Sequence, residues 1–138
     1  MTAKEYLQQY RNADREINSK LDQIRRLREL ATKTTSTLNP DKVQSSQENK
    51  TEKIVAKIVD MENEVNSEID KLIELKHEIC DSIRKVGNAK QRQVLVLRYI
   101  NGKTWERIAV DLDISYQWVC ELHGRALISI NCILLDSN

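Results

Sequence analysis

The stretch KTWERIAVDLDISYQWVCELHGRAL, from Lys103 to Leu127, decides how the C-terminal third of this chain folds. It holds two short amphipathic patterns that meet at Asp113 and Ile114. Ala109, in the first pattern, is small enough for a second helix to cross close to it. Asp113 tolerates the left-handed backbone of a tight turn, and Ile114 is apolar and can plug the corner beneath it. Ser115 can then cap the next helix with its hydroxyl, so the stretch predicts two helices joined by a tight turn.

Working outward from this turn, the pattern predicts a small helical head. Gly87 and Asn88 have the residue types of a helix stop followed by a helix start. Three short helices are expected after them, at about 89–101, 104–112 and 115–135, with Gly102 between the first two. Residues at helical spacing give the last helix a core-facing stripe, namely Val119, Leu122, Ala126 and Ile130.

Two longer segments before the head have a heptad rhythm. Between about Thr2 and Ala31, apolar residues recur every seven positions at Ala3, Tyr10, Ile17, Ile24 and Ala31. From about Thr51 to Val86 a second column consists of Ile58, Val65, Leu72, Ile79 and Val86. A narrow stripe on a helix of roughly 54 Å, at about 1.5 Å per residue, needs a partner helix. The first segment, folding back as an antiparallel hairpin, is the nearer partner, and a second copy of the chain is the other.

Between these segments the apolar rhythm stops. Residues from about 32 to 50 are rich in Ser, Thr, Asn and Gln and include Pro40, the one proline of the chain. Such a segment cannot bury a face, so it is interpreted as a loop or disordered linker. The expected organisation is therefore a hairpin over residues 1–87, with a loop at about 32–50, and a head over residues 88–138.

Composition supports an all-α class. The 138 residues include 3 Gly, 1 Pro and no Phe, and 31% are charged, which is typical of long helices and not of strand-rich domains. The 22 basic and 21 acidic residues give a formal net charge of +1. Strong overall attraction to nucleic acid or membrane is not expected from this balance, so any DNA affinity must come from local arrangement.

Several classes of protein and site are not expected. Cys80, Cys120 and Cys132 are odd in number and widely spaced, no leader pattern precedes them, and no apolar run approaches about 20 residues. A reduced, cytoplasmic compartment and no membrane partner follow. His77 with Cys80, and Cys120 with His123, have a spacing that can share zinc. The sequence does not specify a geometry that brings the two pairs together, so these residues are interpreted as buried or incidental and no metal is predicted. Neither a catalytic arrangement nor a glycine-rich phosphate loop is present, so we expect no enzyme and no cofactor.

The segment KQRQVLVLRYINGKTWERIAVDLDISYQWVCELHGRAL, roughly the last third of the chain, resembles region 4 of bacterial sigma-70 factors. That pattern runs R-x-V-L-x-L-R-Y, a turn with Gly, T-x-x-E-I-A-x-x-L-x-[IV]-S, and a recognition helix ending in A-L. The matching residues are Arg92, Val94, Leu95, Leu97, Arg98, Tyr99, Thr104, Ile108, Ala109, Leu112, Ile114, Ser115, Val119, Leu122, Ala126 and Leu127. A helical N-terminal part before such a head is also similar to small transcriptional regulators of Gram-positive phages and prophages, of the ArpU and RinA type.

The resemblance implies a sequence-specific DNA-binding regulator whose helix over residues 115–127 enters a major groove. Sigma factors carry several Arg and Glu residues on this helix, where the chain has Tyr116, Gln117, Trp118 and Cys120. Arg107 also stands where the pattern has Glu. What carries over is therefore the docking geometry and not recognition of the −35 promoter element.

Within that geometry, Gln117 can pair with adenine and Glu121 can accept a hydrogen bond from cytosine, with Tyr116 beside them. Lys103, Thr104, Arg107 and Arg125 are predicted to contact phosphates, which position a protein without reading sequence. Together with the capping serine, the predicted DNA interface consists of Lys103, Thr104, Arg107, Ser115, Tyr116, Gln117, Glu121 and Arg125.

Charge leaves two alternatives open. Residues 87–138 contain six basic and five acidic side chains, and six minus five is +1, so one head alone should bind DNA weakly. This argues for a homodimer through the N-terminal helices or for a partner such as RNA polymerase. One alternative is a head that binds RNA polymerase without reading bases. The other is a coiled-coil scaffold with a vestigial head.

Overall fold

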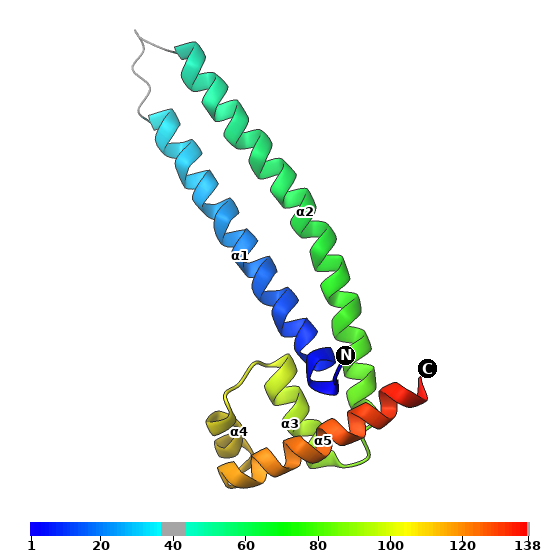
Figure 1. The fold of residues 1–138 in the computed structure, drawn as a ribbon. Coiled ribbons are helices and arrows are strands. Elements are labelled where there is room, and N and C mark those ends of the chain that lie inside the picture. Colours follow the sequence, from blue (N-terminus) through cyan, green and yellow to red (C-terminus); the bar gives the residue numbers. More distant parts are fainter. Residues whose placement is uncertain (37–43, 138) are drawn as a thin grey trace. The chain divides into compact units, whose positions relative to one another are not determined.

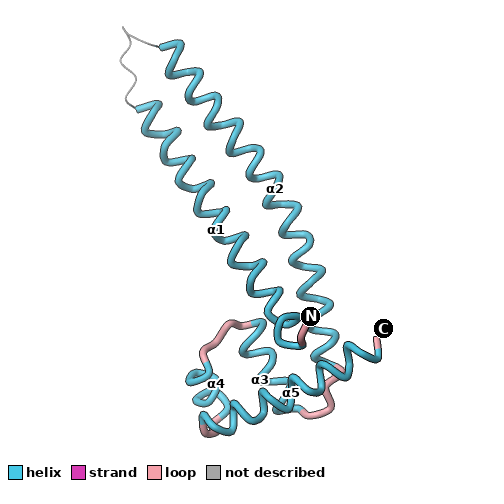
Figure 2. The backbone as a smooth tube through the Cα atoms, in the orientation of Figure 1, coloured by secondary structure: helices cyan, strands magenta, loops and turns pink. Residues whose placement is uncertain are grey.

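In a computed structural model of the chain, which describes residues 1–36 and 44–137, all regular structure in these ranges is helical (Figure 1, Figure 2). No strand occurs among the described residues, which confirms the all-α class. The elements are α1 (Ala3–Ser36), α2 (Gln44–Arg84), α3 (Ala89–Leu95), the π-helical turn η1 (Val96–Ile100), α4 (Trp105–Leu112) and α5 (Tyr116–Asp136).

The chain divides into two compact units. The first contains Met1–Asp14 together with Leu72–Asn138, and the second contains Arg15–Lys71. The division at Gly87 that the helix break predicts differs from this one. The reason is that the first turns of α1 and the last turns of α2 supply core residues to the C-terminal helices.

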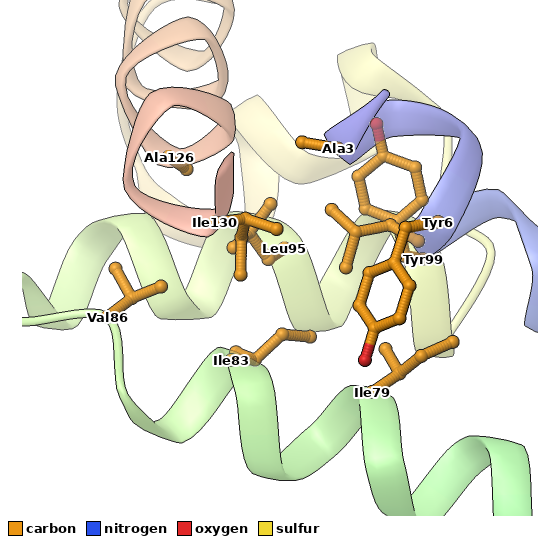
Figure 3. Close-up of a cluster of buried hydrophobic side chains, with 10 residues drawn as sticks. Ala3, Tyr6, Ile79, Ile83, Val86, Leu95, Tyr99, Ala126 and Ile130 are labelled. Carbon is orange, nitrogen blue, oxygen red and sulfur yellow. The ribbon is translucent and has the colours of Figure 1, made fainter. Parts of the chain in front are cut away.

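The larger core of the first unit draws on five elements. Ala3, Tyr6 and Leu7 come from α1, and Ile79 and Ile83 come from α2. Figure 3 shows most of these side chains converging with residues from the turn after α2 and from α3, η1 and α5, namely Val86, Leu95, Tyr99, Ala126 and Ile130. Burial of such large apolar side chains is the main favourable term in folding, so these elements fold as one body.

A buried polar contact accompanies this core. The Tyr6 hydroxyl lies 3.0 Å from the hydroxyl oxygen of Ser82, which is the buried polar residue of the described chain. Burial raises the pKa of Tyr6, so the phenol stays protonated at neutral pH. The bond satisfies both hydroxyls and fixes the start of α1 against the end of α2.

A second core of the first unit lies beneath residues 103–127. It consists of Val94, Ile108, Val119 and Leu122, with Trp105 and Trp118 among the partly buried residues packed against it. All four residues of the stripe predicted for the last helix are buried, as Ala126 and Ile130 belong to the larger core. That stripe is confirmed, and Trp105 packs against the second core.

Within the second unit, the parts of α1 and α2 run antiparallel. The Lys20 ammonium lies 3.1 Å from a Glu64 oxygen and also pairs with Glu68, and Arg28 pairs with Glu62. The partner's number falls as the α1 number rises, which is the signature of antiparallel packing. Four of the heptad residues are buried here, Ile17, Ile24, Ile58 and Val65.

Two expectations about helix boundaries are wrong. The loop expected at about 32–50 is too long, because α1 continues to Ser36 and α2 begins at Gln44; Pro40 lies outside the described residues. Ser, Thr and Gln cost only a fraction of a kcal/mol each in a helix, and extending a helix avoids the cost of nucleation. The helix expected at 89–101 is likewise divided, with regular α-helix ending at Leu95 and a π-turn following.

One described helix, α5, is long and apolar enough to cross a membrane by length and composition. The expectation that no segment approaches this length was therefore too strong. Four α5 residues contribute to the two cores of the first unit. Core helices meet the same criteria, so this property alone does not place the chain in a membrane.

Candidate functional site

The corner between α4 and α5 has the geometry that the sequence predicts. Asp113 adopts φ 54° and ψ 48°, which is the left-handed region. The Ile114 amide donates to the Ala109 carbonyl at 3.1 Å, and the Asp113 amide donates to the Val110 carbonyl at 3.2 Å. This pair of bonds closes a helix with a left-handed residue after its end, and Ile114 packs under the turn against the second core.

Two hydroxyls of the predicted DNA interface are N-caps. Thr104 accepts a bond from the Arg107 amide at 3.2 Å, and Ser115 accepts one from the Trp118 amide at 3.1 Å. Each satisfies an amide that the first helical turn leaves without a partner. Ser115 and Thr104 therefore orient α5 and α4, and one lone pair of each hydroxyl oxygen is engaged in the cap.

The exposed side of α5 carries four of the predicted residues: Tyr116, Gln117, Glu121 and Arg125. Arg125 donates to a Glu121 oxygen at 2.7 Å across one helical turn. Its guanidinium also lies 5.3 Å from the centre of the Trp118 ring. These contacts hold the Arg125 side chain along the helix, and the side chain of Gln117 remains exposed one turn before Glu121.

A second group lies at α4. The Lys103 ammonium is 2.5 Å from one oxygen of Asp111, and Arg107 Nε is 3.1 Å from the other. The hydrogen bond from Lys103 is the main reason that the pKa of Asp111 lies below its ordinary value, with the charge of Arg107 adding to it. The carboxylate is thus ionised at neutral pH. It partly neutralises the positive charges of Lys103 and Arg107, the two residues predicted to contact phosphates.

Asp111 was missed as a site residue by sequence reasoning. The signal that could have found it is the spacing of Arg107 and Asp111, because residues four apart on a helix are neighbours. Asp111 also contacts Lys103, which precedes α4 in the sequence. Helical periodicity does not predict that contact, because Lys103 is not part of the helix.

His123 lies on α5 within an aromatic cluster. Its Nε2 is 2.7 Å from the Tyr99 hydroxyl, and its ring centre is 4.5 Å from that of Trp105. Burial, followed by the charges of Lys4 and Arg98, lowers the pKa of His123 to about 4. A neutral imidazole at physiological pH is therefore part of the packing of the head. The Arg98 guanidinium lies over the same Trp105 ring, 4.3 Å from its centre.

The predicted site residues thus fall into groups. Lys103 and Arg107 lie around Asp111, and Glu121 pairs with Arg125. Thr104 and Ser115 are N-caps of α4 and α5. Among the described residues, no group of three or more His, Cys, Asp or Glu side chains could hold a metal ion. Arg92 and Arg98, which match the sigma-like pattern but are outside the predicted DNA interface, donate to the backbone carbonyls of Val86 and Lys103.

Residues 30–130 match the model of a protein family described as "Protein of unknown function (DUF1492)". The match covers well over half of the chain, so the chain belongs to this family. No curated protein and no solved structure matches it.

Proposed function

We propose that the protein is a sequence-specific DNA-binding transcriptional regulator of the phage and prophage type, acting in the cytoplasm. In this proposal α4 and α5 form a helix-turn-helix, carried by a head on an N-terminal helical hairpin. Residues 115–127 enter the major groove of double-stranded DNA. Gln117, Glu121 and Tyr116 contact base edges, while Lys103, Arg107 and Arg125 contact phosphates.

The observation that carries this proposal is the corner at Asp113. A left-handed residue, an apolar plug at Ile114 and a capping hydroxyl at Ser115 set two helices at a fixed angle. The second helix of the pair then presents a row of exposed polar side chains while its other side is buried. A helix held in this way is the part that helix-turn-helix proteins place in a major groove.

Charge sets the expected strength of binding. Three cations, Lys103, Arg107 and Arg125, face two carboxylates, Asp111 and Glu121. Three minus two leaves one net positive charge, so a single head should bind with a shallow dependence on salt. Two heads brought together by the N-terminal helices would double that charge and favour paired half-sites.

Selection of bound duplexes from a random DNA pool at moderate salt tests the proposal. The expected result is enrichment of one motif by the full chain. Replacement of Gln117 by Ala should relax the preference at one or two positions, at a cost of about 1–3 kcal/mol for a paired base contact. Arg125→Ala should weaken binding to all duplexes, and Lys71→Ala, on α2 outside the head, is the matched control. A folded chain that enriches no motif would refute base reading.

A further test uses the Asp111 carboxylate, which forms ion pairs with Lys103 and Arg107. Asp111→Asn keeps the size of the side chain but removes its charge, and so should release Lys103 and Arg107 for phosphates. We expect affinity for any duplex to rise several-fold at low salt and the salt dependence to steepen. Asp136→Asn, at the far end of α5, removes the same charge and should leave both quantities unchanged. If the two variants have the same duplex affinity and the same salt dependence, Lys103 and Arg107 do not contact DNA.

The alternative function is an interaction protein that binds RNA polymerase, or acts as a scaffold, without reading bases. The observation that favours it is the pairing of the cations with Asp111 and Glu121, which leaves the face nearly neutral. The two functions differ in one measurable property, because only the DNA reader has a salt-sensitive affinity for one duplex sequence.

A further inference from the structure

A groove of about 840 Å³ lies within the first unit, between the end of α2, one side of α3 and η1, and α4. Its apolar lining includes Ile83, Val96, Leu97 and Leu112. Along α3 and η1 the lining residues are Ala89, Arg92, Gln93, Val96 and Leu97, which is the spacing of one helix face. Residues 89–97 extend along the groove for roughly 12 Å at about 1.5 Å per residue, which corresponds to about two helical turns.

The charge around this groove is net positive, although two of its three lining cations are paired with carboxylates. From Ser82 to Trp105 the chain has no acidic residue, and its basic residues are Arg84, Lys85, Lys90, Arg92, Arg98 and Lys103. Three of these, Arg84, Arg92 and Lys103, line the groove. Lys103 pairs with the lining residue Asp111, and Arg84 donates to Asp81, outside the lining, at 2.6 Å. Three minus two leaves one net positive charge, which is carried by Arg92. The Arg92 guanidinium donates to the Val86 carbonyl at 2.6 Å, so its hydrogen bond is with a neutral group and its positive charge is not cancelled there.

An apolar floor and a basic rim together select one kind of occupant. A nucleic-acid backbone would use the rim but would gain nothing from Ile83, Val96 or Leu112. A helix with apolar residues at positions i, i+3, i+4 and i+7 fills such a groove, and acidic residues on its flanks would meet Arg84 and Arg92. We propose that this groove binds an acidic amphipathic helix of a partner protein.

This inference does not rest on DNA reading. No α5 residue lines the groove, and Lys103 is the one residue that it shares with the proposed DNA interface. Variants at Arg84 and Ala89 therefore test the groove without touching the side chains proposed to contact bases. Selection from the DNA pool should give the same motif with these variants as with the natural chain.

The probe for the experiment is a pair of fluorescein-labelled 14-residue helical peptides. Both carry Leu at helical spacing on one face, and the remaining positions are Glu-rich in one peptide and Lys-rich in the other. Fluorescence anisotropy with the full chain should show the Glu peptide binding roughly tenfold or more tightly than the Lys peptide at low salt. Amide chemical shifts in a ¹⁵N-labelled chain should change along residues 89–97 and at Leu112.

Matched variants localise the binding. Arg84→Gln and Lys85→Gln each remove one exposed positive charge, but only Arg84 lines the groove. We expect Arg84→Gln to weaken the Glu peptide about three- to tenfold and Lys85→Gln to change it less than twofold. Ala89→Trp should fill the groove and abolish binding, whereas Lys90→Trp, at a neighbouring exposed position that does not line it, should not.

Thermal unfolding followed by circular dichroism checks that every variant remains folded. Equal affinity for the two peptides, equal effects of the two Gln variants, or shifts confined to α5 would overturn the proposal. Shifts in the groove caused by duplex DNA and not by the Glu peptide would also overturn it, and would assign the groove to nucleic acid.

Discussion

At the scale of single residues, Asp113 is the position where local backbone geometry most directly determines the site. It is the one non-glycine residue with positive φ in the described part of the chain. L-amino acids pay about 1–2 kcal/mol in this region, and Asp pays less than most because its short polar side chain can bond locally. The direction of α5 therefore depends on a residue that is tolerated in the turn but is not the best one for it.

Two substitutions at Asp113 should shift stability in opposite directions. Asp113→Gly removes the steric penalty and should raise the free energy of unfolding by about 0.5–1 kcal/mol. Asp113→Val places a β-branched residue in the left-handed region and should lower it by about 1–2 kcal/mol. Urea unfolding at pH 7 followed by circular dichroism measures both. Equal stability of the two variants would mean that the turn does not keep its left-handed geometry in solution.

His123 should make stability depend on pH. Its pKa is about 4 in the folded chain against 6.5 for the free side chain, so the unfolded chain binds the proton more tightly. The free energy of unfolding should therefore be unaffected by this group above pH 6.5 and should fall as pH drops from 6.5 to 4. At about 1.4 kcal/mol per pKa unit the full loss is roughly 3 kcal/mol.

Urea unfolding of the natural chain at several pH values between 7.5 and 4 measures this loss. His123→Gln should flatten the part of the curve between pH 6.5 and 4.5, where carboxylates still contribute little. The control is His77→Gln, because His77 is exposed on α2. If His123→Gln and the natural chain lose stability in parallel, the imidazole is not buried in its neutral form.

At the scale of elements, sequence patterns predicted what depends on periodicity and caps. The heptad columns, the buried stripe of α5, and the caps Asn88 and Ser115 were all readable, because each depends on neighbours within one or two turns. The end of α3 could not be predicted from the sequence. In η1, the Asn101 amide donates to the Val96 carbonyl at 2.9 Å, and Gly102 then turns the chain at φ 69°. Gly102 marks the turn, but apolar spacing does not distinguish a π-turn from an α-turn.

The candidate site was predictable to a similar degree. Exposure of Gln117, Glu121 and Arg125 follows from their place opposite the buried stripe, and the capping roles of Thr104 and Ser115 follow from their position before a helix. The contact of Lys103 with Asp111 depends on where the chain places residue 103 after Gly102. That path is set by the π-turn and by packing, so sequence reasoning could not include Asp111.

The cap at Ser115 can be tested as a property of α5. Ser115→Ala removes the acceptor for the Trp118 amide and should lower the free energy of unfolding by about 1 kcal/mol. Ser115→Asp retains an acceptor at this position and should stay close to the natural chain. Ser129→Ala, in the middle of α5, removes the same hydroxyl where no cap is made. Chemical denaturation of the three variants should rank Ser115→Ala as the least stable, and any other order would mean that the cap contributes little to α5.

At the scale of the whole molecule, the two compact units do not follow the order of the chain. The first unit combines the start of α1 with the end of α2, which are far apart in the sequence. Tyr6 and Leu7 come from α1, and Ile79 and Ile83 come from α2. Heptad spacing indicated that these positions face a partner, but it did not show that some partners are α3 and α5. A helix can change its packing partner along its length without any change in its apolar rhythm.

This assembly predicts which fragments fold. A fragment of residues 88–138 lacks Ala3, Tyr6, Leu7, Ile79, Ile83 and Val86, which are part of the larger core. Loss of a single large core side chain costs about 2–5 kcal/mol, and the whole stability of a small domain is about 5–15 kcal/mol. We therefore expect this fragment to show no cooperative thermal transition by circular dichroism. Residues 1–14 joined to residues 72–138 should show one, because together they keep every residue of both cores.

The joined fragment needs a flexible link between Asp14 and Leu72. Packed helices lie about 8–10 Å apart, and eight Gly and Ser residues span about 15 Å on average, so such a link is long enough. A matched version with Leu7→Ala should unfold at a clearly lower temperature if the start of α1 packs in the core, because Leu7 is fully buried. Cooperative unfolding of residues 88–138 alone, at the temperature of the joined fragment, would instead show that the head is independent of α1 and α2. In that case the helix break at Gly87 would be the true boundary of the domain.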